Sequence, residues 1–197
     1  MPEAKPEAVI RPLSLASESI LVQAFWIFTF AVLTAIGAQI EIPHQPVPFT
    51  FQTFFVLLSG SLLGKRNGFL AMSFYLLMGV AGLPVFSSGG FGLAKLLGPT
   101  GGYLLSFPIA SIVIAYLLSR QPLAGPFNRP LSYAWTGFSM LIGLLIIFSA
   151  GTLQLNFVYF HDWNEAIKAG FLIFSLWDVL KLVVAAIISQ EISRRLI

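Results

Sequence analysis

The sequence predicts an all-α integral membrane protein with six transmembrane helices, and three observations predict it. Of the 197 residues, 57% are hydrophobic and only 10% are charged, far below the roughly 25% charged residues of a soluble domain. Apolar runs long enough to cross a bilayer recur along most of the chain. Basic residues gather in alternate connections between these runs, which is the pattern of a polytopic membrane protein.

The six spans form a single membrane domain, residues 19–197. They cover about residues 19–40, 50–64, 67–83, 102–119, 131–157 and 165–191. The second and third spans are short, which favours tilted or partly buried helices. Residues 1–18 mix acids, bases and prolines without the apolar core of a cleavable signal peptide, so a solvent-facing cytoplasmic tail is expected there.

The basic residues orient the spans. Eight of the eleven fall on one side, in the tail, the second and fourth loops and the C-terminus: Lys5, Arg11, Lys65, Arg66, Arg120, Arg129, Arg194 and Arg195. The opposite side has only Lys95 and Lys168, and Lys181 lies inside a span. By the positive-inside rule, both termini are expected in the cytoplasm.

Two connections on the predicted outer side have an unusual composition. Residues 41–50 contain three prolines and one histidine, and residues 83–102 form a long connection rich in glycine, serine and proline. Loops of this length are usually functional or disordered, and the second one carries large apolar residues that a solvated linker would not. We expect it to form an ordered cap or a re-entrant segment, so that the binding side is the outside.

An aspartate and a lysine, Asp178 and Lys181, lie three residues apart inside the sixth apolar run, on one face of a helix. At about 1.5 Å per residue, Asp178 is expected about 15 Å from the outer flank at Lys168, near the middle of a bilayer about 30 Å thick. Each charge at that depth costs roughly 2.5–3.5 kcal/mol. An internal salt bridge that only ties helices together is the alternative, but buried ion pairs stabilise poorly, so a polar substrate site is favoured.

Polar and aromatic side chains alternate where residues 46–54 join an extended loop to a helix start. Gln52 and Thr53 are expected to face a polar pocket, because lipid would leave their hydrogen bonds unmade. Thr50 offers a hydroxyl to the same pocket or is only a helix N-cap.

Glycines are concentrated at the start of the fourth span, in residues 98–102 (GPTGG). Gly98 and the glycines after Thr100 let a backbone approach a ligand closely, and free N–H groups at a helix start attract anions. A tight turn that merely starts the helix is the alternative. Lys95, three residues earlier, is a candidate partner for a carboxylate or a solvated lysine.

The first span contains a small-xxx-small pair, Ala31 and Ala35. Such pairs let another helix approach closely. Packing within this protein's own bundle and a surface for a partner subunit are both open.

The sequence gives little support to catalysis. The absence of cysteine excludes disulfides and thiolate metal sites. Residues 60–66 (GSLLGKR) fail as a phosphate loop, because three residues separate the glycines where four are needed and Arg66 replaces the Ser/Thr. Glu41 with His44 is only a weak metal or proton-relay candidate. The chain is therefore not expected to be an enzyme. Its net charge of only +3 does not indicate a nucleic-acid-binding protein.

Three stretches carry a resemblance to a known family: IPHQPVPFTFQTFFVLLSGSLLGKRNG (42–68), YLLMGVAGLPVFSSGGFGLAKLLGPTGGYLLSFP (75–108) and WDVLK (177–181). They resemble BioY, the biotin-specific S component of energy-coupling-factor (ECF) transporters. The resemblance implies a substrate-binding subunit in the bacterial cytoplasmic membrane, with biotin as ligand and no cofactor. It also implies a coupling transmembrane protein and two ATPases as partners, although some members are thought to transport without them, and a toppling motion that releases biotin inside.

The resemblance also implies roles for individual residues. Asp178 and Lys181 match the acidic and basic pair of the family's biotin site, and Ala31 and Ala35 match a docking surface for the coupling subunit. An arginine can hold the valerate carboxylate in this family, but the outer cap here contains none, so Lys95 is the only basic candidate there.

The chemistry of biotin agrees with these residue types. Its ureido ring has two N–H donors and one carbonyl acceptor, so Asp178 can accept and Lys181 can donate in charge-assisted bonds. Phe54 and Trp177 join the candidate walls of the apolar bicycle. The expected biotin-binding residues are Asp178, Lys181, Thr53, Gln52, Phe51, Phe86, Ser88, Lys95, Gly98, Thr100 and Tyr103.

Three rival functions remain at this point. The chain is an S component for another small vitamin, a small membrane enzyme with Asp178 as acid or base, or a structural bundle partner that binds no small molecule. Chemical alteration of a bound compound would distinguish the enzyme, and competition between vitamins would distinguish the cargo.

Overall fold

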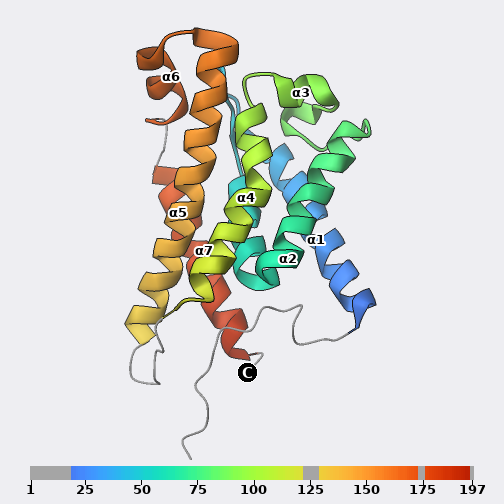
Figure 1. Cartoon of the computed structure of the whole chain (residues 1–197), viewed down its shortest axis with the longest axis vertical. Coiled ribbons are helices and arrows are strands. Elements are labelled where there is room, and N and C mark those ends of the chain that lie inside the picture. The colour runs from blue at the N-terminus through green and yellow to red at the C-terminus, as the bar shows by residue number, and fades with distance from the viewer. Residues whose placement is uncertain (1–18, 122–128, 173–175, 196–197) are drawn as a thin grey trace, which may run out of the picture.

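The computed structural model describes residues 19–121, 129–172 and 176–195, and they form a bundle of long helices closed at one end by short elements (Figure 1). The predicted N-terminal tail, residues 1–18, lies outside the described residues. The helices are α1 (Ile20–Gln39), α2 (Gln52–Val80), α3 (Leu93–Leu97), α4 (Gly101–Leu118), α5 (Arg129–Leu155), α6 (Trp163–Gly170) and α7 (Leu176–Arg195). The smaller elements are β1 (Glu41–Ile42), β2 (Phe49–Thr50), a 3₁₀ turn η2 (Ser87–Gly89) and a π turn η3 (Asn156–Phe160).

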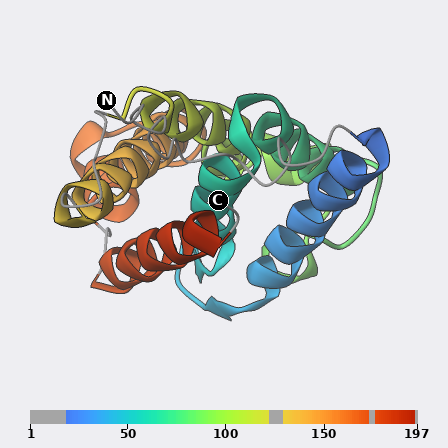
Figure 2. The ribbon, with the colours of Figure 1, turned by 90° about the horizontal axis from the view of Figure 1, so that it is seen from below.

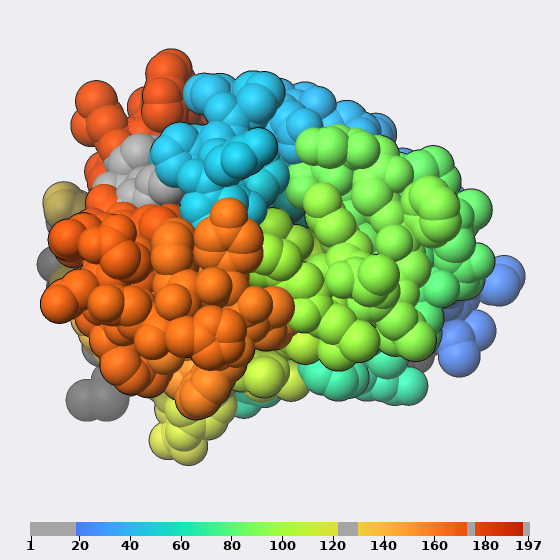
Figure 3. Space-filling model, turned by 90° about the horizontal axis from the view of Figure 1, so that it is seen from above, coloured from blue at the N-terminus to red at the C-terminus, as the bar shows by residue number. Residues whose placement is uncertain are grey.

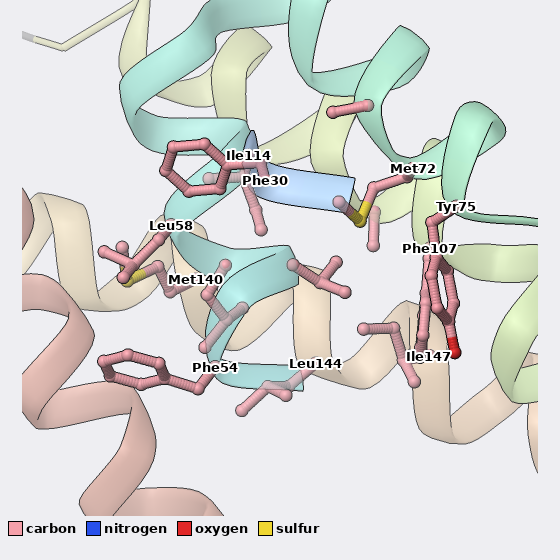
Figure 4. Close-up of a cluster of buried hydrophobic side chains, with 14 of the residues drawn as sticks. Phe30, Phe54, Leu58, Met72, Tyr75, Phe107, Ile114, Met140, Leu144 and Ile147 are labelled. Carbon is pink, nitrogen blue, oxygen red and sulfur yellow. The ribbon is translucent and has the colours of Figure 1, made fainter. Parts of the chain in front are cut away.

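The helices have the character of a membrane protein. Within the described residues, three segments are long and apolar enough to cross a membrane: Ile20–Gln39, Gly101–Leu118 and Pro130–Phe160. The last of these joins α5 to the π turn. A core of large side chains from α1, α2, α4 and α5 holds the bundle together, including Phe30, Met72, Tyr75, Phe107, Ile114 and Met140 (Figure 4).

Helix α2 reverses direction at Gly64, whose φ of 77° and ψ of −178° lie in a region that is essentially restricted to glycine. The two arms fold back on each other, because a Cβ atom on Gly68 would lie only 3.0 Å from the carbonyl oxygen of Ser59. The reversal falls between the second and third spans predicted from the sequence, and it places the exposed Lys65 and Arg66 at the tip of the turn.

The expectation of one continuous helix over residues 165–191 is wrong. The short helix α6 ends at Gly170, and α7 is a separate helix with Asp178 in its first turn. Asp162 starts α6 as its N-cap, with its carboxylate accepting hydrogen bonds from the N–H groups of Asn164 and Glu165. Asp178 therefore does not lie about 15 Å along a helix from Lys168. It lies near a helix N-terminus, where the helix dipole favours a negative charge.

The short elements gather at the end of the bundle opposite the C-terminus (Figure 1). Strands β1 and β2 pair antiparallel, with Glu41 opposite Thr50 and Ile42 opposite Phe49. Seen from this end, the 41–50 hairpin, the cap of residues 83–100 and the segment around α6 meet in one surface (Figure 3).

Candidate binding site

A cavity lies beneath the hairpin and the cap, where β2, the start of α2, α4, α5 and α7 converge, and its volume is about 60 Å³. The polar side of its lining consists of Thr50, Gln52, Thr53, Ser87, Thr100, Tyr103, Asp178 and Lys181. The apolar side consists of Val47, Pro48, Phe49, Leu104, Phe107, Ile147 and Phe148. The cavity therefore combines one polar edge with an apolar body.

The acid–base pair predicted from the sequence faces this cavity. Lys181 Nζ lies 2.6 Å from Asp178 Oδ1, and the two side chains are only 10% and 3% exposed. Lys181 also donates to the backbone oxygen of Thr50 at 3.0 Å and to Oγ1 of Thr53 at 2.8 Å. An ammonium group has three donors. The lysine thus joins α7 to the hairpin and to the first turn of α2.

A chain of hydrogen bonds connects the polar edge to the cap. Thr50 Oγ1 donates to Oε1 of Gln52 at 2.8 Å, and Gln52 Nε2 donates to the hydroxyl of Tyr75. The Tyr75 hydroxyl in turn donates to the backbone oxygen of Val85 at 3.1 Å. Phe51, not Thr50, is the N-cap residue of α2, and no side chain caps that helix. Thr50 therefore acts through Gln52 and not as the N-cap.

Tyr103 is held by two glycines. Its ring lies so close to Gly151 that a Cβ atom there would be 2.3 Å from the ring carbons, and its hydroxyl donates to the backbone oxygen of Gly170 at 2.9 Å. The tyrosine therefore links the cavity wall on α4 to α5 and to the end of α6.

The cap is tied to the first outer connection by two side chains. Glu41 accepts hydrogen bonds from the Ser88 backbone N–H at 3.1 Å and from Ser88 Oγ at 2.6 Å. Gln39 donates to the Phe86 oxygen at 3.0 Å and accepts from Gly89 N–H at 3.3 Å. Ser88 adopts a left-handed φ of 56°, which is uncommon for a residue other than glycine. Ser88 is exposed, and its neighbour Ser87 lines the cavity in its place.

Several predicted site residues lie away from the cavity. Phe86 is completely buried against Gly79 and does not line the cavity. Phe51 lies against Phe54, with ring centroids 4.6 Å apart, and faces the neighbouring groove described below. Lys95 lies beside Gly90, and no residue of the lining contributes a second cation besides Lys181. The structure therefore leaves Lys95 outside the cavity.

The glycines of residues 98–102 serve helix packing. A Cβ atom on Gly101 would lie 1.7 Å from the Leu96 oxygen, and one on Gly102 would lie 2.3 Å from the Ala150 oxygen. Gln154 on α5 donates at 2.8 Å to the backbone oxygens of both Leu96 and Gly98. Gly98 thus anchors the cap on α5, and of this stretch only Thr100 lines the cavity.

The predicted docking pair of α1 is only partly accessible. Ala31 has no exposed surface and belongs to the core shared with α2, whereas Ala35 is half-buried at the edge of that core. Ala31 therefore takes part in packing within this chain, which was the alternative for the pair. The role of Ala35 in docking stays a prediction.

Sequence analysis missed Ser87 in the cap, and the lining residues of the long helices that it missed are apolar. Ile147 and Phe148 lie in α5, and Leu104 and Phe107 lie in α4, inside helices that are apolar on most of their surface. No signal in such a helix separates a cavity wall from a core contact.

His44 contacts the Phe49 ring, and the described residues contain no group of three potential metal ligands.

A second hollow lies on the other side of the hairpin wall. This apolar groove has a volume of about 430 Å³ and is lined by Ile40, Glu41, Ile42, Phe49, Thr50, Phe51, Phe54, Trp177, Leu180, Lys181 and Val184. Phe49, Thr50 and Lys181 border both the groove and the cavity. Trp177, predicted as a cavity wall, lies in the groove.

Comparison with known proteins gives a consistent result. Residues 11–197 match the BioY family model. The biotin transporter BioY of Thermotoga maritima is 44% identical over 165 residues, which cover 84% of this chain and 92% of that protein. The probable biotin transporter BioY of Pyrococcus horikoshii is 38% identical over 163 residues, which cover 83% and 91%.

A solved structure supports the fold. It is described as the S-component for biotin from an ECF-type ABC transporter, and it superposes with a TM-score of 0.78 at 22% identity. The match covers 88% of this chain and 92% of that one. At this identity the likeness concerns the helical architecture.

Proposed function

The chain belongs to the BioY family, and on this basis we propose that it binds biotin and takes it up across the bacterial cytoplasmic membrane as the S component of an ECF-type transporter. Relatives of the chain are named biotin transporters, and this supports a role in transport and not in catalysis. The proposal includes six membrane passes with both termini in the cytoplasm, where α2 supplies two passes through its reversal at Gly64.

The observation that carries the proposal is the buried Asp178–Lys181 pair on the wall of a largely apolar cavity. The ureido N–H groups of biotin match the carboxylate, and the ureido oxygen matches the ammonium group. Phe107, Phe148 and Tyr103 supply apolar surface for the bicyclic ring. Thr53 and Gln52 complete the polar edge.

The cavity of about 60 Å³ is smaller than a vitamin requires, because ligand pockets typically measure roughly 300 Å³ or more. We infer that lining residues move when biotin binds. The lining outside the long helices consists of the hairpin residues Val47 to Thr50, the cap residue Ser87 and Thr100 at the start of α4.

Calorimetric titration of the purified protein tests the proposal. We expect biotin to bind tightly and 2-iminobiotin, which lacks the ureido oxygen, to bind much more weakly. Other vitamins serve as competitors. Tight binding of another vitamin with no heat from biotin would assign a different cargo, and chemical alteration of bound biotin detected by mass spectrometry would assign an enzyme.

The partners are tested separately. We propose that a coupling transmembrane protein and ATPase subunits associate with this chain, and Ala35 on α1 is the accessible member of the predicted docking pair. Replacement of Ala35 by Trp is expected to abolish co-purification with the coupling protein while leaving biotin binding intact. Unchanged co-purification would remove α1 from the docking surface.

A further inference from the structure

Two cations converge on one tyrosine at the end of the bundle opposite the cavity. Lys65 Nζ lies 4.8 Å and Arg120 Cζ lies 5.3 Å from the centre of the Tyr116 ring, so the two charges are no more than about 10 Å apart. The reversal of α2 and the end of α4 lie side by side at this end of the bundle (Figure 2). Lys65 and Arg66 come from that reversal, and Arg120 follows the end of α4. All four side chains are exposed.

No carboxylate neutralises these cations within the described part of the chain. The ion pairs found there join Lys168 to Glu165, Lys181 to Asp178 and Arg194 to Glu191. The other described acids are occupied at the opposite end, where Glu41 binds Ser88 and Asp162 caps α6. Lys65 and Arg120 over the Tyr116 ring, with the exposed Arg66 next in the chain, therefore form a cluster of positive charge.

A second tyrosine at the same end shows the neutralised arrangement. Arg194 Cζ lies 5.0 Å from the Tyr133 ring centre, and Arg194 also pairs with Glu191 at 3.0 Å. The Tyr133 hydroxyl donates to the same carboxylate at 2.7 Å. Both clusters place a cation over an aromatic ring, but only the Tyr133 cluster contains its own anion.

The surroundings of the Tyr116 cluster suit a lipid. Phe69 and Leu70 follow Arg66 on the second arm of α2, and each is 38% exposed. Tyr116 itself is 45% exposed, and tyrosine is enriched where a membrane meets water. Phosphate groups form charge-assisted bonds with arginine and lysine. We propose that Lys65 and Arg120, which lie over the Tyr116 ring, together with the adjacent Arg66, bind the phosphate of an anionic phospholipid whose acyl chains lie along Phe69 and Leu70.

Native mass spectrometry of the detergent-purified protein tests this proposal. The wild type, Lys65→Gln/Arg120→Gln and the matched control Arg194→Gln are each titrated with phosphatidylglycerol and with phosphatidylcholine carrying the same acyl chains. A basic residue near an anionic lipid contributes about fivefold to binding, so we expect the double variant to lose roughly 25-fold in phosphatidylglycerol affinity. Arg194→Gln and every phosphatidylcholine titration are expected to match the wild type.

Each outcome decides the proposal. Equal retention of the two lipids by the wild type, or an equal loss in Arg194→Gln, would overturn it. Displacement of phosphatidylglycerol by millimolar inorganic phosphate would reassign the cluster to a free anion. If the double variant does not fold, raised salt applied to the wild type must weaken phosphatidylglycerol binding. Biotin titration of the same samples tests the cavity at the opposite end of the bundle. The lipid proposal and the biotin proposal can therefore be refuted separately.

Discussion

Lys181 Nζ lies 2.6 Å from Asp178 Oδ1, with both side chains almost fully buried and the aspartate in the first turn of its helix. Removal of one charge would leave the other buried without its partner. We expect Lys181→Met to weaken biotin binding by roughly 2–5 kcal/mol, as measured by calorimetry.

The controls for this prediction separate binding from folding. The double variant Asp178→Asn/Lys181→Met restores charge balance, so its stability should recover while its biotin affinity stays low. Glu165→Gln/Lys168→Gln removes an ion pair of the same spacing that is exposed, and it should leave biotin affinity unchanged. Wild-type affinity in Lys181→Met would show that the pair is structural.

Gly151 sets the position of Tyr103, because a Cβ atom there would lie 2.3 Å from the tyrosine ring. Gly151→Ala is expected to push the ring towards the cavity and to weaken biotin binding by about 1–3 kcal/mol. Gly137→Ala on the same helix is the control, since its nearest neighbour would be 3.9 Å away. Additional replacement of Tyr103 by Leu should restore affinity in part. Wild-type biotin affinity in Gly151→Ala would indicate that biotin does not contact Tyr103.

Glu41 ties the cap to the hairpin through both oxygens. Loss of these bonds removes a restraint on a strained turn at Ser88. We expect Glu41→Ala to increase the dissociation rate of biotin several-fold, measured by stopped-flow, and to speed hydrogen exchange at residues 86–90. His44→Ala, which alters the same connection without touching the cap bonds, should keep wild-type rates. A slow exchange rate in Glu41→Ala would mean that Gln39 alone holds the cap.

Gly64 adopts a backbone conformation that side chains strongly disfavour. Gly64→Ala is therefore expected to destabilise the protein by about 1–3 kcal/mol, visible as a lower melting temperature in detergent. Gly137→Ala lies within helix α5 and should melt at or above the wild-type temperature. Equal melting of the two variants would indicate that the reversal of α2 tolerates another geometry.

Most of the polar edge of the cavity could be predicted from sequence, with Ser88 in place of Ser87, whereas its walls on α4 and α5 could not. Asp178 and Lys181 are visible because charges are costly inside an apolar run. Ile147 and Phe148 have the same character as the residues on the other faces of α5, so their position on the cavity wall depends on how the helices pack. Helix rotation is set by contacts that composition does not record.

Glycines have the same sequence signature whether they approach a ligand or pack against a helix. Gly101 and Gly102 were candidates for a ligand-binding backbone, and both lie against neighbouring backbone oxygens instead. A missing side chain allows close approach of a ligand or of another backbone, so the spacing of glycines alone does not distinguish a ligand site from a packing contact. The break between α6 and α7 was missed for a related reason, because an apolar run continues across Gly170 although the helix ends there.

Phe49, Thr50 and Lys181 separate the small cavity from the larger apolar groove, because all three border both hollows. An incoming molecule that displaces Phe49 would move its ring into a hollow that is already hydrophobic, and not into water. Expansion of the cavity at the expense of the groove would therefore expose little new hydrocarbon surface. Detergent tails that fill the groove would oppose the same displacement, so the measured affinity for a guest should depend on the chain length of the detergent.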